Sequence, residues 1–380
     1  MRTLRSLLVT ALAALTLPTL VLAQQQPVAP TLAAKSWLLV ESASGQELAA
    51  QAADNRLDPA SLTKLMTAYL TFSALKQGTI KLDQMVVVSE KAWRQEGSRM
   101  FIKVGTQVKV EDLIKGMIIQ SGNDACVALA ELIAGSEENF AQMMNKEAQR
   151  LGMKGTSFRN AAGLPDPNHY TTARDLATLA GALIRDFPED YAKYYSLKEF
   201  TYNNIKQPNR NRLLWLDPSV DGVKTGHTEA AGYCLISSAK RDSRRLLAVV
   251  LGTTSDNVRA QESLKLLNFG FQAYEAVKVV AKDQAVSDLK VWKGKENTVK
   301  AGFRNDLVVA VPKGLGAKVK TELVANPTLI APIAAGQKLG TLKVNIDDKP
   351  FGEYPVVALG DVPAAGIFGR TIDSMRLWFH

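Results

Sequence analysis

Three short motifs follow one another along this 380-residue chain, and their side chains suit acyl transfer through a serine ester. In chain order the motifs are Ser61-Leu62-Thr63-Lys64, Ser121-Gly122-Asn123 and Lys224-Thr225-Gly226. They supply a nucleophilic hydroxyl, a lysine that can act as its base, a second hydroxyl, a side-chain amide and a cation. No single motif carries this interpretation, and the ordered set of three is the evidence for it.

The same short patterns recur elsewhere, so the context of each copy decides its value. Ser-x-x-Lys also occurs at Ser73–Lys76, Ser237–Lys240 and Ser287–Lys290, and a literal Ser-Asp-Asn occurs at Ser255–Asn257. The first copy falls inside a predicted helix, where the serine N–H is already bonded. The second falls on a predicted strand and its turn, and the third lies in a β-rich region without a helix start. Ser255–Asn257 follows the third motif, and we interpret it as a turn.

A serine hydroxyl needs a base within hydrogen-bonding distance before it can attack an amide. We predict that Ser61 opens a helix over residues 61–75, which places Lys64 on the same face three residues later. The helix start favours negative charge and leaves the Ser61 N–H free to donate to an oxyanion. Burial and the charge of Lys224 are expected to lower the pKa of Lys64, so that its amine can accept the proton. A simple helix-capping role for Ser61 is the alternative.

The other two motifs are predicted to add further groups to the same cleft. Ser121-Gly122-Asn123 lies between two predicted helices, where a turn can present a hydroxyl and an amide while the glycine adopts an unusual backbone angle. Lys224 and Thr225 open a predicted strand and can hold a substrate carboxylate, while Gly226 lets a ligand backbone approach closely. The backbone N–H of His227 is a candidate second oxyanion donor.

The elements that must position these side chains form an α+β pattern in the first part of the chain. A strand, a tight turn and a second strand are predicted over residues 37–48. Apolar spacing and capping residues predict helices around the motifs, and a hairpin follows the third motif. The predicted helices span residues 61–75, 110–119, 124–134 and 172–185, and the hairpin spans residues 234–252. This pattern indicates an antiparallel sheet with a helical cluster rather than alternating βαβ units.

The composition changes after residue 273, where short β-rich runs punctuated by Gly, Pro and Asn predict a small all-β domain. We assign residues 24–273 to a catalytic domain and residues 274–361 to the β-rich domain. The predicted runs lie at residues 289–292, 298–303, 307–312, 317–323, 338–346 and 355–359.

The last segment, residues 362–380, predicts an amphipathic helix. Phe368, Ile372, Met375 and Phe379 fall on one helical stripe, and arginines lie on the remaining surface. Bulky apolar residues that follow a complete domain favour a helix lying in a membrane interface. Docking of the helix on the β-rich domain is the alternative.

The first 23 residues are typical of a cleaved secretory signal, with Arg2 and Arg5 before an apolar run and a small-residue cleavage site at Ala23. An uncleaved membrane helix is the alternative. Removing the two arginines lowers the formal net charge from +9 by two units. This modest excess of positive charge suits binding to anionic lipid or to a carboxylate-bearing substrate. The lack of a run of basic residues argues against binding to nucleic acid.

Cysteine and histidine usage is sparse. Cys126 and Cys234 are too few for a disulfide scaffold. Two buried free thiols are favoured, and a single disulfide between the two cysteines is the alternative. His169, His227 and His380 form no ligand spacing, so neither a metal nor an organic cofactor is expected.

The motifs and their flanks carry a family resemblance. The chain resembles low-molecular-weight penicillin-binding proteins of the D-alanyl-D-alanine carboxypeptidase type, within the serine penicillin-recognising superfamily. The resemblance rests on residues 58–66 (Asp-Pro-Ala-Ser-Leu-Thr-Lys-Leu-Met), 207–211 (Gln-Pro-Asn-Arg-Asn) and 221–227 (Asp-Gly-Val-Lys-Thr-Gly-His). It covers nearly the whole chain and implies a β-lactamase/transpeptidase-like catalytic domain, an all-β domain and a C-terminal amphipathic anchor.

The resemblance implies roles in acyl transfer for four residues of the first two motifs. Ser61 is then the acylated nucleophile, Lys64 is its base, and Ser121 passes the proton toward the leaving D-alanine. Asn123 is implied to bind the peptide.

Further residues are implied to bind or orient the substrate. Lys224 and Thr225 would shape the electrostatic field of the site. Arg210 and Arg259 match arginines that the family keeps near the site, and Arg259 would help to read the terminal carboxylate; structural salt bridges are the alternative. His169 matches a family histidine near the cleft, with a surface-loop histidine as the alternative.

The same resemblance implies the partners and the location. The substrate would be a peptidoglycan stem peptide, and β-lactam antibiotics would be covalent inhibitors. The protein would act in cell-wall biogenesis and cell shape as a peripheral protein at the periplasmic face of the bacterial inner membrane, and a homodimer stays open.

Three alternative functions stay in view. A class A-like β-lactamase needs a deacylating glutamate between the second and third motifs, but no glutamate occurs between Glu147 and Glu189. A D,D-endopeptidase of the same superfamily is the second. The third is a non-catalytic wall-binding protein, against which the intact side chains of all three motifs argue.

Overall fold

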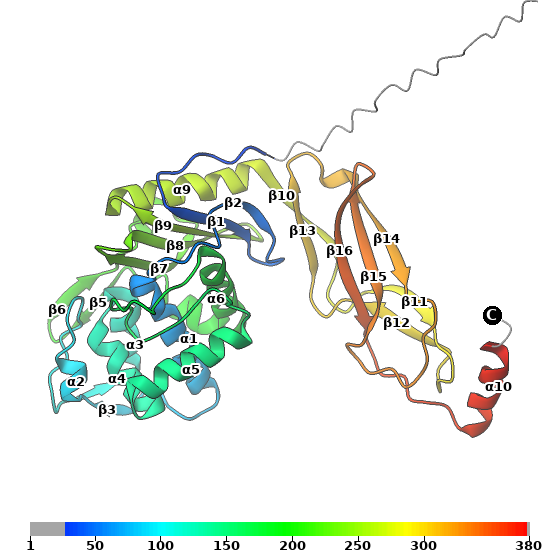
Figure 1. The fold of residues 1–380 in the computed structure, drawn as a ribbon, viewed down its shortest axis with the longest axis horizontal. Coiled ribbons are helices and arrows are strands. Elements are labelled where there is room, and N and C mark those ends of the chain that lie inside the picture. Colours follow the sequence, from blue (N-terminus) through cyan, green and yellow to red (C-terminus); the bar gives the residue numbers. More distant parts are fainter. Residues whose placement is uncertain (1–26, 378–380) are drawn as a thin grey trace, which may run out of the picture.

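The computed structural model describes residues 27–377, and Figure 1 shows them as two parts that lie side by side. The first part, which ends with helix α9 (Asp256–Ala273), combines a sheet with a cluster of helices. The second part is an elongated β structure with helix α10 (Ile367–Leu377) at its far end. The predicted signal at residues 1–23 and the last three residues of the predicted C-terminal helix, 378–380, lie outside the described residues.

A five-stranded antiparallel sheet is the frame of the first part. Its strand order is β2-β1-β9-β8-β7, so β7 lies at one edge. Leu38 and Leu39 enter different hydrophobic clusters, as expected for side chains that alternate between two faces. Helix α9 packs on one face and the helical cluster covers the other (Figure 1). The strands are β1 (Ser36–Glu41), β2 (Glu47–Gln51), β7 (Val220–Thr228), β8 (Gly232–Arg241) and β9 (Arg244–Thr253).

The helical cluster is built around α1 (Lys64–Lys76), whose side chains are almost all buried. Because neighbours enclose α1 on several sides, its sequence shows no single apolar stripe. The other helices are α2 (Glu90–Trp93), α3 (Val110–Lys115), α4 (Asn123–Ala134), α5 (Glu137–Arg150), α6 (Ala173–Asp186), α7 (Pro188–Tyr194) and α8 (Leu213–Leu216). Two hairpins complete the cluster, β3 (Met85–Val87) with β4 (Gln107–Lys109) and β5 (Glu199–Tyr202) with β6 (Ile205–Pro208).

Helix α3 continues into an unusual turn. Residues Gly116–Gln120 form a π-helical turn, and Ser121 follows in the left-handed conformation with φ 66°. The helix predicted over residues 110–119 is therefore confirmed in extent, although its second half is wider than an α-helix. This turn delivers Ser121 to the gap between α3 and α4.

The second part contains two sheets. Strand β10 (Tyr274–Val280) pairs with β13 (Leu307–Pro312), and five further strands have the order β11-β12-β16-β15-β14. Val309, Val311 and Ile346 form a buried cluster that joins the two sheets. The five strands are β11 (Ala285–Lys290), β12 (Thr298–Gly302), β14 (Val319–Ala325), β15 (Lys338–Ile346) and β16 (Lys349–Ala358).

Polar contacts connect the two parts. The side-chain amide of Gln46 donates to the Ala310 carbonyl oxygen at 2.8 Å and accepts from the Ala310 N–H at 2.9 Å. The Tyr274 hydroxyl donates to the carbonyl oxygen of Leu48 at 2.9 Å. Strand β10 follows α9 directly, and bonds from the β1–β2 hairpin support this junction.

The α+β class and most predicted elements are confirmed, but five helices were not predicted, namely α2, α5, α7, α8 and α9. The interpretation of Ser255–Asn257 as a turn is wrong, because the Ser255 hydroxyl accepts from the Val258 N–H at 3.2 Å and caps α9. The buried face of α9 mixes Leu266 and Leu267 with Arg259, Ser263 and Gly270, so its apolar stripe is interrupted and did not reveal the helix.

Two further findings concern the thiols and the membrane. Cys126 and Cys234 are both buried and free, which is the arrangement that the sequence favoured. Among residues 27–377, no helix combines the length and the apolar character needed to cross a bilayer.

Candidate active site

The nucleophile lies in a turn that packs on the edge strand of the sheet. Ser61 belongs to the 3₁₀ turn Ala60–Thr63, directly before α1, and it lines a cavity. A Cβ on Gly226 of β7 would lie 3.1 Å from Leu62 Cγ and 3.2 Å from the Pro59 carbonyl oxygen. Glycine is needed there because the protein's own nucleophile turn approaches the strand, in addition to any ligand that enters the cavity.

Lys64 contacts three oxygen atoms of the site. Its Nζ lies 2.9 Å from Ser61 Oγ, 2.7 Å from Asn123 Oδ1 and 2.6 Å from the Ala162 carbonyl oxygen. The side chain is 1% exposed, and burial lowers its pKa from 10.5 to about 8. The charge of Arg210 adds to this lowering, and Lys64 and Lys224 repel each other as expected. A neutral amine is therefore accessible near neutral pH.

The second motif faces Lys64 from the start of α4. Ser121 is buried, and its Oγ has no hydrogen-bond partner among the residues that the structure describes. Asn123 is fixed, because its Nδ2 also donates to the Glu96 carbonyl oxygen at 2.6 Å. The Ser121 hydroxyl is thus the group of this motif that is available to a bound ligand.

The unusual backbone angle predicted for Gly122 lies instead at Ser121. Gly122 has φ −62°, whereas Ser121 has φ 66°. Glycine is required at position 122 for space, since a Cβ there would lie 2.8 Å from Asp124 Oδ1 and 3.1 Å from the Met100 nitrogen. That carboxylate accepts from the Met100 N–H and so holds the segment that forms one rim of the cavity.

The carbonyl acceptor for Lys64 comes from the loop at residues 160–164, which the sequence analysis missed. Asn160 Oδ1 accepts from the Gly163 N–H at 2.7 Å and shapes the loop. A Cβ on Gly163 would lie 1.8 Å from the Ala60 carbonyl oxygen, so the loop presses directly on the nucleophile turn. No sequence signal marks Ala162, because any residue type can offer a backbone carbonyl.

Strand β7 brings the third motif to the other side of the cavity. Lys224 is buried, and its Nζ donates to the Thr225 carbonyl oxygen at 3.2 Å. Burial and the charge of Lys64 hold the pKa of Lys224 well below its ordinary value. Thr225 and His227 line the cavity, and the His227 ring packs against the Tyr233 ring at a tilt of 32°, with 4.0 Å between centroids.

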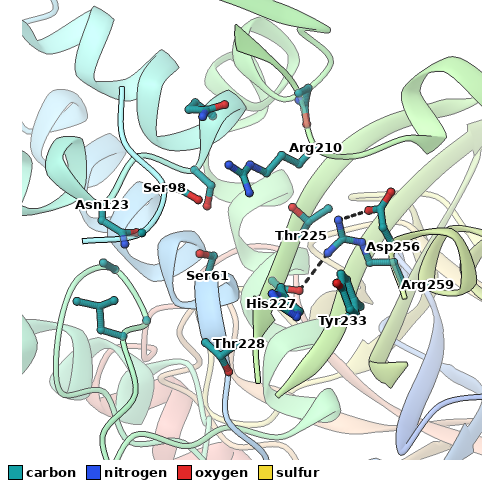
Figure 2. Close-up of a pocket in the computed structure, with 18 of the residues that line it drawn as sticks. Ser61, Ser98, Asn123, Arg210, Thr225, His227, Thr228, Tyr233, Asp256 and Arg259 are labelled. Carbon is teal, nitrogen blue, oxygen red and sulfur yellow. Dashed lines mark hydrogen bonds and ion pairs between the residues drawn. The ribbon is translucent and has the colours of Figure 1, made fainter. Parts of the chain in front are cut away.

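The cavity has a volume of about 960 Å³ and a cationic lining. Arg210 points into it and has no ion pair within the described part of the chain (Figure 2). Arg259 is buried, donates to the Gly226 carbonyl oxygen at 3.1 Å and forms an ion pair with Asp256. The structural salt bridge that the sequence left as an alternative therefore holds for Arg259 but not for Arg210. The charged lining residues are Arg210, Arg212, Arg259 and Asp256.

His169 lies outside the cavity lining and contacts the nucleophile turn from behind. Its Nε2 lies 3.0 Å from Thr63 Oγ1, and its side chain is 2% exposed. Burial lowers its pKa to about 4, so the ring is neutral at pH 7. The surface-loop alternative is therefore wrong, and the residue supports the segment that carries Ser61.

Asp256 and Tyr233 are cavity residues that sequence reasoning did not assign. A serine followed by an acidic residue is a common helix start, and this signal at Ser255 would have placed Asp256 on a first helical turn. Tyr233 had no such signal. Within residues 27–377, no three His, Cys, Asp or Glu side chains are grouped as a metal site requires.

In this site a serine lies at a helix start and is paired with a lysine. A turn that carries a hydroxyl and an amide lies on one side, and an edge strand with cationic side chains lies on the other. This arrangement defines a serine acyl-transfer enzyme. The comparisons with known proteins agree. The chain belongs to the D-alanyl-D-alanine carboxypeptidase family of serine peptidases, which it matches over residues 23–255. Residues 274–364 match the family described as the C-terminal domain of penicillin-binding protein 5.

Two of the individual relatives extend over both parts of the chain. D-alanyl-D-alanine carboxypeptidase DacC of Escherichia coli is 44% identical over 371 residues, which cover 96% of this chain and 92% of the relative. The crystal structure of penicillin binding protein 5 from Haemophilus influenzae has a TM-score of 0.84 and 43% identity, covering 88% of this chain and 99% of that chain. The ampicillin-bound penicillin-binding protein D2 from Listeria monocytogenes has a TM-score of 0.59 and 31% identity, covering 63% and 98%. The family resemblance is confirmed.

Proposed function

We propose that this protein removes the terminal D-alanine from peptidoglycan stem pentapeptides through an acyl ester on Ser61, and that β-lactam antibiotics acylate the same serine. The observation that carries the proposal is the 2.9 Å contact between Lys64 Nζ and Ser61 Oγ. Membership of the carboxypeptidase family supports the substrate class and a role in the cell wall.

The partners of Lys64 orient its amine for proton transfer. A neutral amine has two N–H donors and one lone pair. The Asn123 side-chain oxygen and the Ala162 carbonyl oxygen can only accept, so together they engage both N–H groups. The lone pair then faces Ser61 Oγ, which gives up its proton as it attacks the scissile carbonyl carbon.

The remaining steps use groups already at the site. The bond from Ser61 Oγ to the carbonyl carbon forms, and the C–N bond to the terminal D-alanine breaks. We assign to Ser121 Oγ the transfer of the proton from Lys64 to the leaving nitrogen. The backbone N–H groups of Ser61 and His227 are assigned to the oxyanion. Water then hydrolyses the ester and restores the serine.

We assign carboxylate binding to the wall formed by β7 and the arginines. The unpaired Arg210 and the hydroxyl of Thr225 are placed to receive the terminal carboxylate. The buried Lys224 adds a positive field in its protonated form. Arg259 adds less, because Asp256 already neutralises it.

Deacylation of β-lactam adducts is expected to be slow. The cavity lining that lies between the second and third motifs carries no carboxylate, and Asp256 is committed to two arginines. Water near the ester therefore lacks the carboxylate base that a class A-like β-lactamase uses. A long-lived penicilloyl ester is expected instead of antibiotic turnover.

The proposal is tested by labelling with a fluorescent penicillin and mapping the adduct by peptide mass spectrometry. We expect stable label on Ser61 in the wild type and in Ser73→Ala, which alters a serine of another Ser-x-x-Lys pattern, and none in Ser61→Ala. If the protein carries no label and the antibiotic is recovered intact, the proposed acyl-enzyme intermediate is rejected. Hydrolysis of defined muropeptides then separates carboxypeptidase from endopeptidase activity.

We also propose that α10 attaches the protein to the periplasmic face of the inner membrane. Asp373 accepts from the Lys293 N–H at 2.7 Å, so a polar side of α10 contacts the β-rich part. Ile367 and Met375 are 74% and 63% exposed, and they leave apolar surface for a membrane interface. Export through the predicted signal at residues 1–23 is part of this proposal.

Flotation with phosphatidylglycerol-containing vesicles tests the attachment. The wild type is expected to float with the vesicles, and the double variant Ile367→Ser, Met375→Ser is expected to stay in solution. Equal flotation of both proteins would exclude α10 as the attachment element.

A further inference from the structure

The literal Ser-Asp-Asn at Ser255–Asn257 has no place in the catalytic set, yet it brings a carboxylate into the cavity. Ser255 caps α9, and Asp256 occupies the first helical turn, where its charge is favourable. Asp256 is the one acidic residue among the described residues that line the cavity. Figure 2 shows it beside Arg259 and across from Arg210.

This carboxylate is shared between two arginines. Its Oδ1 contacts Arg259 Nη2, and its Oδ2 lies 3.5 Å from Arg212 Nη1. Arg259 is also tied to the Gly226 carbonyl oxygen, and its side chain is only 8% exposed. Arg259 therefore meets any ligand as half of an ion pair, whereas Arg210 meets it as a free cation.

We propose that Asp256 is a specificity-determining residue that weakens the binding of carboxylate-bearing ligands at this end of the cavity. This inference rests on the proposed function, in which the substrate ends in a carboxylate. Asp256 competes with that carboxylate for Arg259 and repels it at short range. The same repulsion promotes release of the free D-amino acid after acylation.

The substitution Asp256→Asn tests the charge while it keeps the side-chain size. With a diacetylated Lys-D-Ala-D-Ala tripeptide, we expect KM to fall by about three- to tenfold, as one nearby like charge at intermediate dielectric predicts. The turnover number is expected to change by less than KM, since the reacting groups are untouched. Inhibition by free D-alanine is expected to tighten, and added NaCl should weaken binding more steeply than in the wild type.

Asp54→Asn is the matched control. Asp54 also pairs with an arginine, Arg174, but it lies outside the cavity lining, so its loss should leave KM unchanged. Asp256→Ser provides a second variant with a small polar residue on the first helical turn, and it should lower KM in the same direction.

An unchanged or higher KM in both Asp256 variants would overturn the inference and leave Asp256 as a residue that only holds Arg259. The proposed function is checked separately by penicillin labelling of Ser61 in the same preparations. Labelled variants with unaltered KM reject only the Asp256 inference, whereas a wild type that is neither labelled nor active rejects both.

Discussion

At the scale of single residues, the site depends on how Lys64 is surrounded. Two carbonyl acceptors and the nucleophile take its three hydrogen-bonding positions, and burial brings its pKa to about 8. Acylation needs the neutral amine, whose fraction rises with pH up to that pKa. We expect the second-order rate of penicillin acylation to rise about tenfold per pH unit below about pH 8 and to level off above it. Stopped-flow labelling across pH measures this profile, and a rate that is flat from pH 6 to 9 would contradict it.

Replacing Lys64 by arginine should abolish this chemistry. An arginine side chain stays protonated, so Lys64→Arg should lower the acylation rate by at least about a thousandfold. Lys76→Arg, at the exposed end of the same helix, should react like the wild type in the same labelling assay. A reactive Lys64→Arg variant would assign the base elsewhere.

The buried His169 makes stability depend on pH. Its pKa is about 4 in the folded protein and about 6.5 when exposed, so between these values the unfolded chain binds more protons and stability falls as pH falls. Moving from pH 7 to pH 5 should remove about 2 kcal/mol of unfolding free energy through this residue. Urea denaturation of the wild type and of His169→Gln measures the difference. Equal losses in both proteins would show that another group is responsible.

At the scale of elements, the loop at residues 160–164 and the nucleophile turn behave as one unit. Gly163 has φ +84°, and an added Cβ would overlap the Ala60 carbonyl oxygen at 1.8 Å. Gly163→Ala is therefore expected to displace the loop, cost several kcal/mol and remove most of the acylation activity. Gly78→Ala is the matched control, because φ is +73° there and nothing lies within 4 Å of the added Cβ. It should cost only about 1 kcal/mol, and equal acylation losses would refute the argument.

The same element shows how far the sequence could predict the site. Ser61, Lys64, Ser121 and Lys224 were found because side-chain chemistry must be encoded by residue type. The Ala162 carbonyl oxygen was not predicted as a partner of Lys64, because every residue type has a backbone carbonyl. The strands of the main sheet were found from alternation, and the helix at Thr172 was found from its capping pattern. Helix α9 was missed although Ser255 caps it, because polar residues and a glycine interrupt its buried apolar side.

At the scale of the whole molecule, one glutamine side chain joins the two parts. Ala310 is fully buried, and both of its backbone groups are bound by Gln46. Gln46→Ala leaves them without these bonds, so we expect a loss of about 1–3 kcal/mol and faster proteolysis near the connection. Penicillin labelling of Ser61 should be unchanged. Gln77→Ala, at an exposed helix end, is the control and should have little effect on either measurement. Equal stability of the two variants would show that the Gln46 side chain does not stabilise the junction of the two parts.

The wide turn at Gly116–Gln120 also limits how the gene can change in length. Each residue of an α-helix advances about 100° around the axis, and the π-helical turn holds one residue more than a regular turn. A single-codon deletion in this segment would restore the regular helix and swing Ser121 about a quarter-turn away from Lys64. Among related sequences, we therefore expect few insertions or deletions between residues 110 and 121, even where many point substitutions are tolerated. Length changes should instead be found in exposed turns such as the one at Gly336.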